Sequence, residues 1–145
     1  MKIVLQRVKH CSVTVAGSVC GAIEQGFLIL LGVEPNDTPE HADFLAKKCA
    51  HLRIFHDTEN KMNLSIIDIQ GQALVVSQFT LLGDCSRGRR PDFTNAAESK
   101  KAKELYDYFV VQLKKLIPHV ETGVFGAMMD VALVNDGPIT LLLDR

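Results

Sequence analysis

The sequence predicts an α/β fold: a single domain, residues 1–145, with a curled, mostly antiparallel mixed sheet that is barrel-like, and two main helices. Three observations predict this fold. Many apolar stretches are separated by short turns, which favours hairpin-linked strands. Two longer stretches place apolar residues at helical spacing. A chain of 145 residues with 47% hydrophobic residues also suits one domain with a buried core.

The first part of the chain is expected to form three strands, at residues 2–15, 18–24 and 27–34. The first strand alternates apolar and polar residues, and the third is almost continuously apolar, which is typical of a strand buried on both faces. A turn at Ala16-Gly17 would place Val13 opposite Cys20. The four cysteines are scattered without a C-x-x-C spacing, so we expect reduced thiols, mostly in the core.

The first helix is expected to begin at Thr38-Pro39-Glu40. A hydroxyl for capping, a proline at the first helical position and an acid in the first turn are all typical of a helix start. Apolar residues then follow at helical spacing: Ala42, Leu45, Ala46, Cys49 and Leu52. A short strand at 53–56 and a polar loop at 57–63 come next.

The second half is expected to contain a hairpin, an irregular segment, a second helix and three strands. The hairpin would pair residues 65–69 with 72–80 around Gln70-Gly71. Residues 82–94 read as irregular, and residues 96–116 form a helix that Pro118 ends. The last strands are expected at 119–125, 128–134 and 139–143.

The composition limits the classes of partner. The net charge of −1 gives the chain no general attraction to polyanions, so nucleic-acid binding would need a local basic patch. Arg87, Arg89 and Arg90 form one such cluster, either a solvated loop or a phosphate contact. No signal-peptide pattern follows Met1, and no apolar run is long enough to span a membrane. We therefore expect a soluble, cytoplasmic protein with no membrane partner.

The segment Ser77-Gln78-Phe79-Thr80 is a candidate catalytic segment. Strand alternation would place Ser77 and Thr80 on opposite faces, unless the strand is irregular there. As a nucleophile Thr80 would need an activating base, and no base stands at a telling spacing. A hydroxyl that bonds backbone or holds substrate is the alternative. The five histidines show no metal-binding spacing, so we expect no metal and no cofactor.

Three further features could belong to a site. Arg7 lies within an apolar strand, so its guanidinium either reaches solvent or bonds carbonyl groups in a buried site. Residues 123–129 contain two glycines beside Phe125 and Met129, which fits either a core turn or a pocket wall. Gly137-Pro138 separates two apolar runs; it is either a simple turn or a stiff kink that presents carbonyl oxygens outward.

Together these segments resemble the D-aminoacyl-tRNA deacylase family over nearly the whole chain. The two most specific are Ser77-Gln78-Phe79-Thr80 and Asn135-Asp136-Gly137-Pro138. Ile139, where a valine is common, is a mild apolar variation. The other matching segments share the family's order and spacing: residues 2–8, 32–33, 52–55, 61–65, 88–91 and 121–126.

The resemblance implies hydrolysis of the ester between a D-amino acid and the terminal adenosine of tRNA, by a homodimer without a cofactor. It implies that Gly137-Pro138 has a cis peptide bond and enters the partner's active site. Its carbonyl oxygens would hold the substrate's α-amino group and exclude an L side chain, so glycyl-tRNA would also be hydrolysed. Steric exclusion by rigid backbone rejects one hand whatever the side chain is.

The resemblance also implies roles for single residues. The backbone amides of Phe79 and Thr80 would stabilise the oxyanion, with Ser77 and Gln78 in the same catalytic segment, and Thr80 would position substrate. The ribose 2′-hydroxyl of the tRNA would help the reaction. Substrate binding would further involve Phe125, Met129 and Arg7, and the acceptor stem would contact Arg87, Arg89 and Arg90.

Two other functions stay open from the residues alone. One is a nucleic-acid-binding module without turnover, which would need a larger basic face. The other is a hydrolase of small esters or amides that uses Thr80 as its nucleophile.

Overall fold

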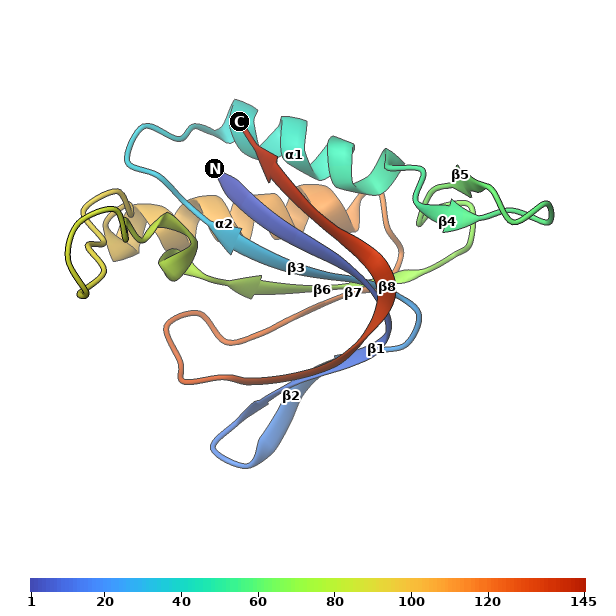
Figure 1. Ribbon diagram of the computed structural model, residues 1–145, viewed down its shortest axis with the longest axis horizontal. Helices are drawn as coiled ribbons and strands as arrows, with labels where there is room; N and C mark the ends of the chain where they lie inside the picture. Colours follow the sequence, from blue (N-terminus) through green and yellow to red (C-terminus); the bar gives the residue numbers. More distant parts are fainter.

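The computed structural model describes all residues, 1–145, and has a strongly curved six-stranded sheet with two helices. Figure 1 shows β1 and β8 bending together, so that the sheet nearly closes into a barrel, with both chain ends at the same side. This confirms the predicted fold class. The elements are β1 (Lys2–Val15), β2 (Ser18–Ile23), β3 (Gly26–Gly32), α1 (Pro39–His51), β4 (Phe55–His56), β5 (Met62–Leu64), β6 (Gln72–Ser77), the 3-10 helix η1 (Phe79–Leu82), α2 (Ser99–Lys114), β7 (Val120–Thr122) and β8 (Asp130–Asp144).

The sheet is mixed and mostly antiparallel. Strand β1 pairs antiparallel with β2, β3 and β8, whereas β6 pairs in parallel with β3 and with β7. A parallel pair needs a long crossover, and α1 lies in the one between β3 and β6. Gly26 lets these two strands meet, because a Cβ there would lie 1.7 Å from the carbonyl oxygen of Gln72.

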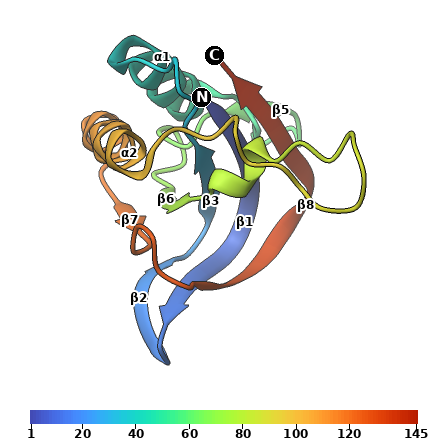
Figure 2. The same ribbon diagram turned by 90° about the vertical axis from the view of Figure 1, so that its left-hand side faces the viewer.

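The buried strands β3 and β6 divide their side chains between two apolar clusters. Phe27, Ile29 and Val75 join the larger cluster with the helices, whereas Leu28 and Leu74 join the smaller one on the opposite face. Figure 2 shows α1 and α2 next to each other on one side of the sheet. This alternation confirms that β3 is buried on both faces, because the helices cover one side and the curled β1–β8 pair covers the other.

The predicted hairpin at residues 65–80 is wrong. Residues 65–69 form turns, and β6 pairs with β3 and β7 instead. The carboxylate of Asp68 accepts hydrogen bonds from the backbone N–H of Ser65 at 2.8 Å and from its hydroxyl at 2.7 Å. Such local side-chain bonds favour a turn over a strand. The residues just before this turn, in β5, pair with β4.

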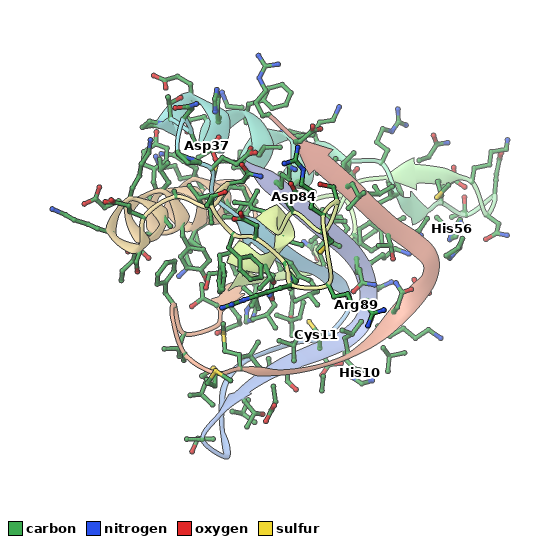
Figure 3. All side chains as sticks on the ribbon, turned by 60° about the vertical axis from the view of Figure 1, so that its left-hand side comes forward. His10, Cys11, Asp37, His56, Asp84 and Arg89 are labelled. Carbon is green, nitrogen blue, oxygen red and sulfur yellow. The ribbon has the colours of Figure 1, made fainter.

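The hairpin of β1 and β2 differs from its predicted register by one residue. Val13 lies opposite Gly21, not Cys20, because the register shifts between Val13 and Thr14. The four cysteines are free thiols; Cys11 and Cys49 are buried, but Cys20 and Cys85 are exposed. Figure 3 shows His10 and Cys11 on opposite sides of β1, as strand alternation requires.

The last strands also differ from the expectation. Residues 130–144 form one continuous strand, β8, so Gly137-Pro138 lies inside a strand and is not a simple turn. The pairing of β8 with β1 shifts register between Gln6 and His10, which accommodates the proline. The expected strand at 119–125 shortens to β7, and the expected helix at 96–116 shortens to α2.

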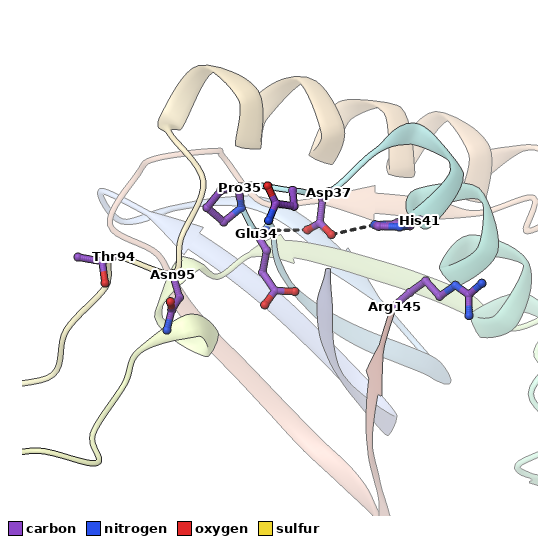
Figure 4. Close-up of a pocket in the computed structure, with 8 residues that line it drawn as sticks. Glu34, Pro35, Asp37, His41, Thr94, Asn95 and Arg145 are labelled. Atoms are coloured by element: carbon purple, nitrogen blue, oxygen red, sulfur yellow. Dashed lines mark hydrogen bonds and ion pairs between the residues drawn. The ribbon is translucent and has the colours of Figure 1, made fainter.

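Helix α1 begins at Pro39 as predicted, but the hydroxyl of Thr38 makes no capping hydrogen bond. Asp37 orders this end instead: its carboxylate accepts from the N–H of Glu34 at 2.6 Å and lies 3.0 Å from Nδ1 of His41. Figure 4 shows these groups lining a polar hollow beside Arg145. This hollow lies away from the predicted catalytic segment and contains none of its residues.

Candidate active site

A cavity of about 650 Å³ opens where β3 and β6 end, beside the first turns of α2 and the loop that leads into β8. Clefts outside the carboxyl ends of parallel strands are common ligand sites. The cavity brings together six residues that the sequence singled out: Ser77, Gln78, Phe79, Thr80, Phe125 and Met129. Arg7, Gly137 and Pro138 do not line it.

The catalytic segment is irregular because β6 stops at Ser77 and the chain turns directly into η1. Gln78 has φ −146° and ψ 78°, and its N–H donates to the carbonyl oxygen of Leu31 at 2.8 Å. This break ends the strand alternation, so Ser77 and Thr80 both line the cavity. The sequence predicted that Ser77 and Thr80 could share one face only if the strand were irregular here, and this condition is met.

The first two residues of η1, Phe79 and Thr80, line the cavity. The backbone N–H of Leu81 donates the first hydrogen bond of this short helix, to the carbonyl oxygen of Gln78 at 3.3 Å. The backbone N–H groups of Phe79 and Thr80 therefore donate no hydrogen bond within the helix. Neighbouring N–H groups at the start of a helical turn can donate to a negatively charged oxygen. The side chain of Phe79 is 58% exposed and packs edge-on against Phe93, with ring centres 5.1 Å apart.

The side chains that line the cavity offer no strong base. The hydroxyl of Thr80 accepts a hydrogen bond from the side-chain amide (Nε2) of Gln78. Tyr106 is the single ionisable lining residue, and its hydroxyl donates to the carbonyl oxygen of Val75 at 2.8 Å. Burial raises the pKa of Tyr106, so the phenol is neutral at ordinary pH. The cavity therefore gives Thr80 no partner that would activate it as a nucleophile.

Sequence reasoning missed Tyr106. The residue lies on the apolar stripe of α2, next to Leu105, where an aromatic side chain is ordinary core. Its ring lies 5.7 Å from that of Phe125, across the cavity wall. Gly123 allows this wall to close, because a Cβ there would lie 2.6 Å from the sulfur of Met129.

Gly137-Pro138 lies exposed on the bend of β8, and its peptide bond is cis. Arg7 anchors the residue before it. The side chain of Arg7 is 2% exposed; its guanidinium contacts the carboxylate of Asp136 at 2.9 Å and donates to the carbonyl oxygens of Asp136 and Ile54. Of its two predicted environments, Arg7 therefore occupies the buried, carbonyl-bonded one.

The amide of Asn135 completes the anchor of the Gly137-Pro138 segment. It donates to the carbonyl oxygen of Arg7 at 2.9 Å and to that of Ile139 at 3.1 Å. Backbone groups on both sides of Gly137-Pro138 are thereby held, while the two residues themselves face outward.

The arginine cluster lies on the exposed loop between η1 and α2 (Figure 3). Two backbone hydrogen bonds between Asp84 and Asp92, of 2.7 and 2.9 Å, close this loop. Hydrogen bonds from Ser86 lower the pKa of Asp84, so its carboxylate stays charged at neutral pH. Arg87, Arg89 and Arg90 form no ion pair with another residue of the chain.

Comparison with known proteins decides the family. A family model described as D-Tyr-tRNA(Tyr) deacylase matches residues 4–144. The chain belongs to this family. D-aminoacyl-tRNA deacylases from Exiguobacterium sibiricum and Thermus aquaticus are 57% and 55% identical to it; the alignments cover 100% and 99% of this chain and 100% and 95% of theirs. These relatives are ester hydrolases, so the chain is an enzyme of the deacylase family.

Solved structures agree with the fold. A c-Myc DNA unwinding element binding protein superposes with a TM-score of 0.95 at 39% identity, over 100% of this chain and 99% of that one. A probable eukaryotic D-amino acid tRNA deacylase has a TM-score of 0.87 at 17% identity, over 99% and 98% of the two chains, and shows the shared fold alone. Neither helix of this deacylase has the length and hydrophobicity needed to cross a membrane.

Proposed function

We propose that the chain, acting as one domain over residues 1–145, hydrolyses the ester between a D-amino acid and the terminal ribose of tRNA, which releases free tRNA and the D-amino acid. The observation that supports this most directly is the match of residues 4–144 to the deacylase family, with full-length relatives of that name. The site of action would be the cytoplasm, where tRNA is charged, and the role would be proofreading of chirality.

The chemistry would rest on backbone donors and on the substrate itself. The amides of Phe79 and Thr80, which η1 leaves outside its ladder, would stabilise the oxyanion. The terminal ribose 2′-hydroxyl would take part in activating the attack, because the lining side chains provide no base. Ser77, Gln78 and Thr80 would hold the substrate by hydrogen bonds, against the walls formed by Phe125 and Met129.

Chirality would be sensed by Gly137-Pro138 of a second protomer. The segment is exposed and anchored through Arg7, so it can project as a firm piece of backbone. In a homodimer it would enter the partner's cavity, bind the α-amino group through its carbonyl oxygens and leave no room for an L side chain. Arg7 would contribute to substrate binding by positioning this segment. Because glycine has no side chain to exclude, glycyl-tRNA would also be hydrolysed.

Exposed apolar side chains support the homodimer. Leu142 is 79% exposed and Val134 is 41% exposed, both on β8, while Met128 at the cavity rim is 92% exposed. Large exposed apolar side chains can mark a protein interface, and β8 carries two of these three. Arg87, Arg89 and Arg90, on the loop next to the cavity, would contact phosphates of the acceptor stem.

The decisive experiment compares D-Tyr-tRNA, L-Tyr-tRNA, Gly-tRNA and D-tyrosine methyl ester as substrates of the same preparation. We expect fast loss of the ester in D-Tyr-tRNA and in Gly-tRNA, with L-Tyr-tRNA and the methyl ester largely intact. Equal hydrolysis of D- and L-Tyr-tRNA would refute the selector. Fast cleavage of the methyl ester would instead favour a small-ester hydrolase that uses Thr80.

A second candidate function is binding of nucleic acid without turnover. The 39% identical structure is named as a binding protein for a DNA unwinding element, which favours this alternative. Tight binding of duplex DNA, together with no loss of any aminoacyl ester, would support it over the deacylase.

A further inference from the structure

A second cationic surface lies at the C-terminal end of α1, apart from the arginine cluster. We name it the α1-end groove; it is lined by Phe44, Lys47, Lys48, His51, Leu52 and Arg53. Lys47 and Lys48 take part in no ion pair or hydrogen bond with another side chain. Arg53 bonds only uncharged acceptors, the backbone oxygen of Asn63 at 2.6 Å and its side-chain oxygen at 3.2 Å. The groove therefore keeps most of its positive charge for a partner.

The groove combines the cations that are common at a helix end with an aromatic ring and a hollow. Basic residues near a helix C-terminus interact favourably with its dipole, and α2 likewise ends with Lys114 and Lys115. At α1, however, the cations surround a hollow with an aromatic ring, and the guanidinium of Arg145 lies 4.6 Å from the centre of the Phe44 ring. The Asp68 carboxylate interacts with Arg53 and His51 and offsets part of this charge. Several cations around a shallow hollow suit the phosphates of a nucleic-acid backbone.

The side chain of Arg7 connects the groove to the Gly137-Pro138 segment. Arg53 directly precedes Ile54, whose carbonyl oxygen is bound by Arg7, and Arg7 also holds Asp136. If Gly137-Pro138 enters the partner's cavity, the α1-end groove would lie near that cavity, because Arg7 bonds both Asp136 and the residue that follows Arg53. The loop of Arg87 to Arg90 reaches the same cavity from the other protomer, since Phe93 in that loop contacts Phe79.

We propose that the α1-end groove binds phosphates of the tRNA whose 3′ end occupies the partner's cavity. This inference rests on the proposed function, because it takes the tRNA substrate and the cross-subunit arrangement from it. Each bound tRNA would then contact cations from both protomers, the arginine loop of one and the α1-end groove of the other.

The test is the double substitution Lys47→Gln with Lys48→Gln in the full chain, measured by the salt dependence of binding to uncharged tRNA. Each phosphate contact steepens the slope of log affinity against log salt by about 0.7 to 0.9. This corresponds to about a threefold loss of affinity between about 50 and 200 mM salt. We expect the slope to become shallower by the equivalent of one to two phosphate contacts. We also expect KM for D-Tyr-tRNA to rise at low salt. Hydrolysis of D-tyrosyl-adenosine, which has no phosphate, should stay unchanged.

The matched control is Lys114→Gln with Lys115→Gln, which removes the same charge from the end of α2 and should leave the slope as in the wild type. A groove variant with the wild-type slope would overturn the inference, even if its melting temperature falls, because the lysines would then only stabilise α1. A wild-type protein that binds tRNA but hydrolyses no D-aminoacyl ester would refute the proposed function, while the binding slopes would still decide the groove.

Discussion

The guanidinium of Arg7 lies 2.9 Å from the carboxylate of Asp136 and also bonds the carbonyl oxygen of Ile54. One buried side chain on β1 thus joins β8 to the segment that precedes β4. Asp136 directly precedes Gly137, so this pair sets the position of the exposed Gly137-Pro138 segment.

Arg7→Ala should destabilise the protein and weaken chiral discrimination together. Removing one member of a buried ion pair costs about 3 to 5 kcal/mol, and Arg7 is 2% exposed. Asp136→Asn should cost a similar amount, about 3 to 5 kcal/mol, because it leaves the buried guanidinium of Arg7 without its negative partner. Urea unfolding and the ratio of D- to L-Tyr-tRNA hydrolysis measure the two effects. An Arg7→Ala protein with unchanged stability would contradict the anchoring role.

Gly137→Ala should fold normally and yet lose activity or discrimination. Within the protomer the added Cβ would meet only the side-chain oxygen of Asn135 at 3.9 Å, an ordinary contact, so the change in stability should be within about 0.5 kcal/mol. A large loss in deacylation would then support the proposed contact of Gly137 with a second chain, because the contacts within this chain would not explain it.

Gly26→Ala is the matched contrast for this substitution. There the Cβ would lie 1.7 Å from the backbone oxygen of Gln72, so we expect a loss of at least about 3 kcal/mol in unfolding free energy. If Gly137→Ala kept wild-type discrimination between D- and L-Tyr-tRNA, the selector role of this residue would be lost.

Thr80→Val should keep most of the activity. The side chain keeps its shape and loses only the hydroxyl, which accepts from Gln78 and has no base beside it. We expect a loss of at most about tenfold in single-turnover deacylation, whereas removal of a true nucleophile can cost about 10⁶-fold. Complete inactivity, with a normal melting temperature, would revive the Thr80 nucleophile.

Arg89→Ala should weaken tRNA binding uniformly and reduce the salt slope by about one contact. The side chain is exposed and free of ion pairs, so the substitution should leave the unfolding free energy nearly unchanged. Fluorescence anisotropy with labelled tRNA at several salt concentrations measures the slope. A slope equal to that of the wild type would remove Arg89 from the RNA contact.

Stability should fall at alkaline pH because of two buried thiols. Burial raises the pKa of Cys11 and of Cys49 from 9.0 to about 12. Above pH 9 the unfolded chain loses these protons while the folded chain keeps them, so the free energy of unfolding decreases by about 1.4 kcal/mol per pH unit and thiol until pH 12.

Urea unfolding between pH 8 and pH 11 measures this effect, with Cys49→Ala as the comparison, since that variant should lose stability less steeply. Parallel curves for the variant and the wild type would contradict the contribution of Cys49.

Local patterns in the sequence predicted the main elements well. The alternation in residues 2–15, the apolar run from Phe27 and the two helical stripes reflect which faces each element buries, and this is written in neighbouring residues. The hairpin at 65–80 was wrong because Asp68 caps a turn there, and because β6 finds parallel partners far along the chain. The register of β1 with β2 was wrong because a bulge at Val13 leaves no clear local signal.

By itself the sequence determined the family, the apolar faces and the residue types that meet at the site, because these depend on order and spacing. Tertiary structure alone decided that β6 breaks at Ser77, so that Ser77 and Thr80 share a cavity, and that Tyr106 forms part of its wall. It also decided that Arg7 bonds Asp136, a partner 129 residues away. Such contacts arise only when distant segments pack together, since a buried guanidinium must find its acceptors wherever the fold brings them.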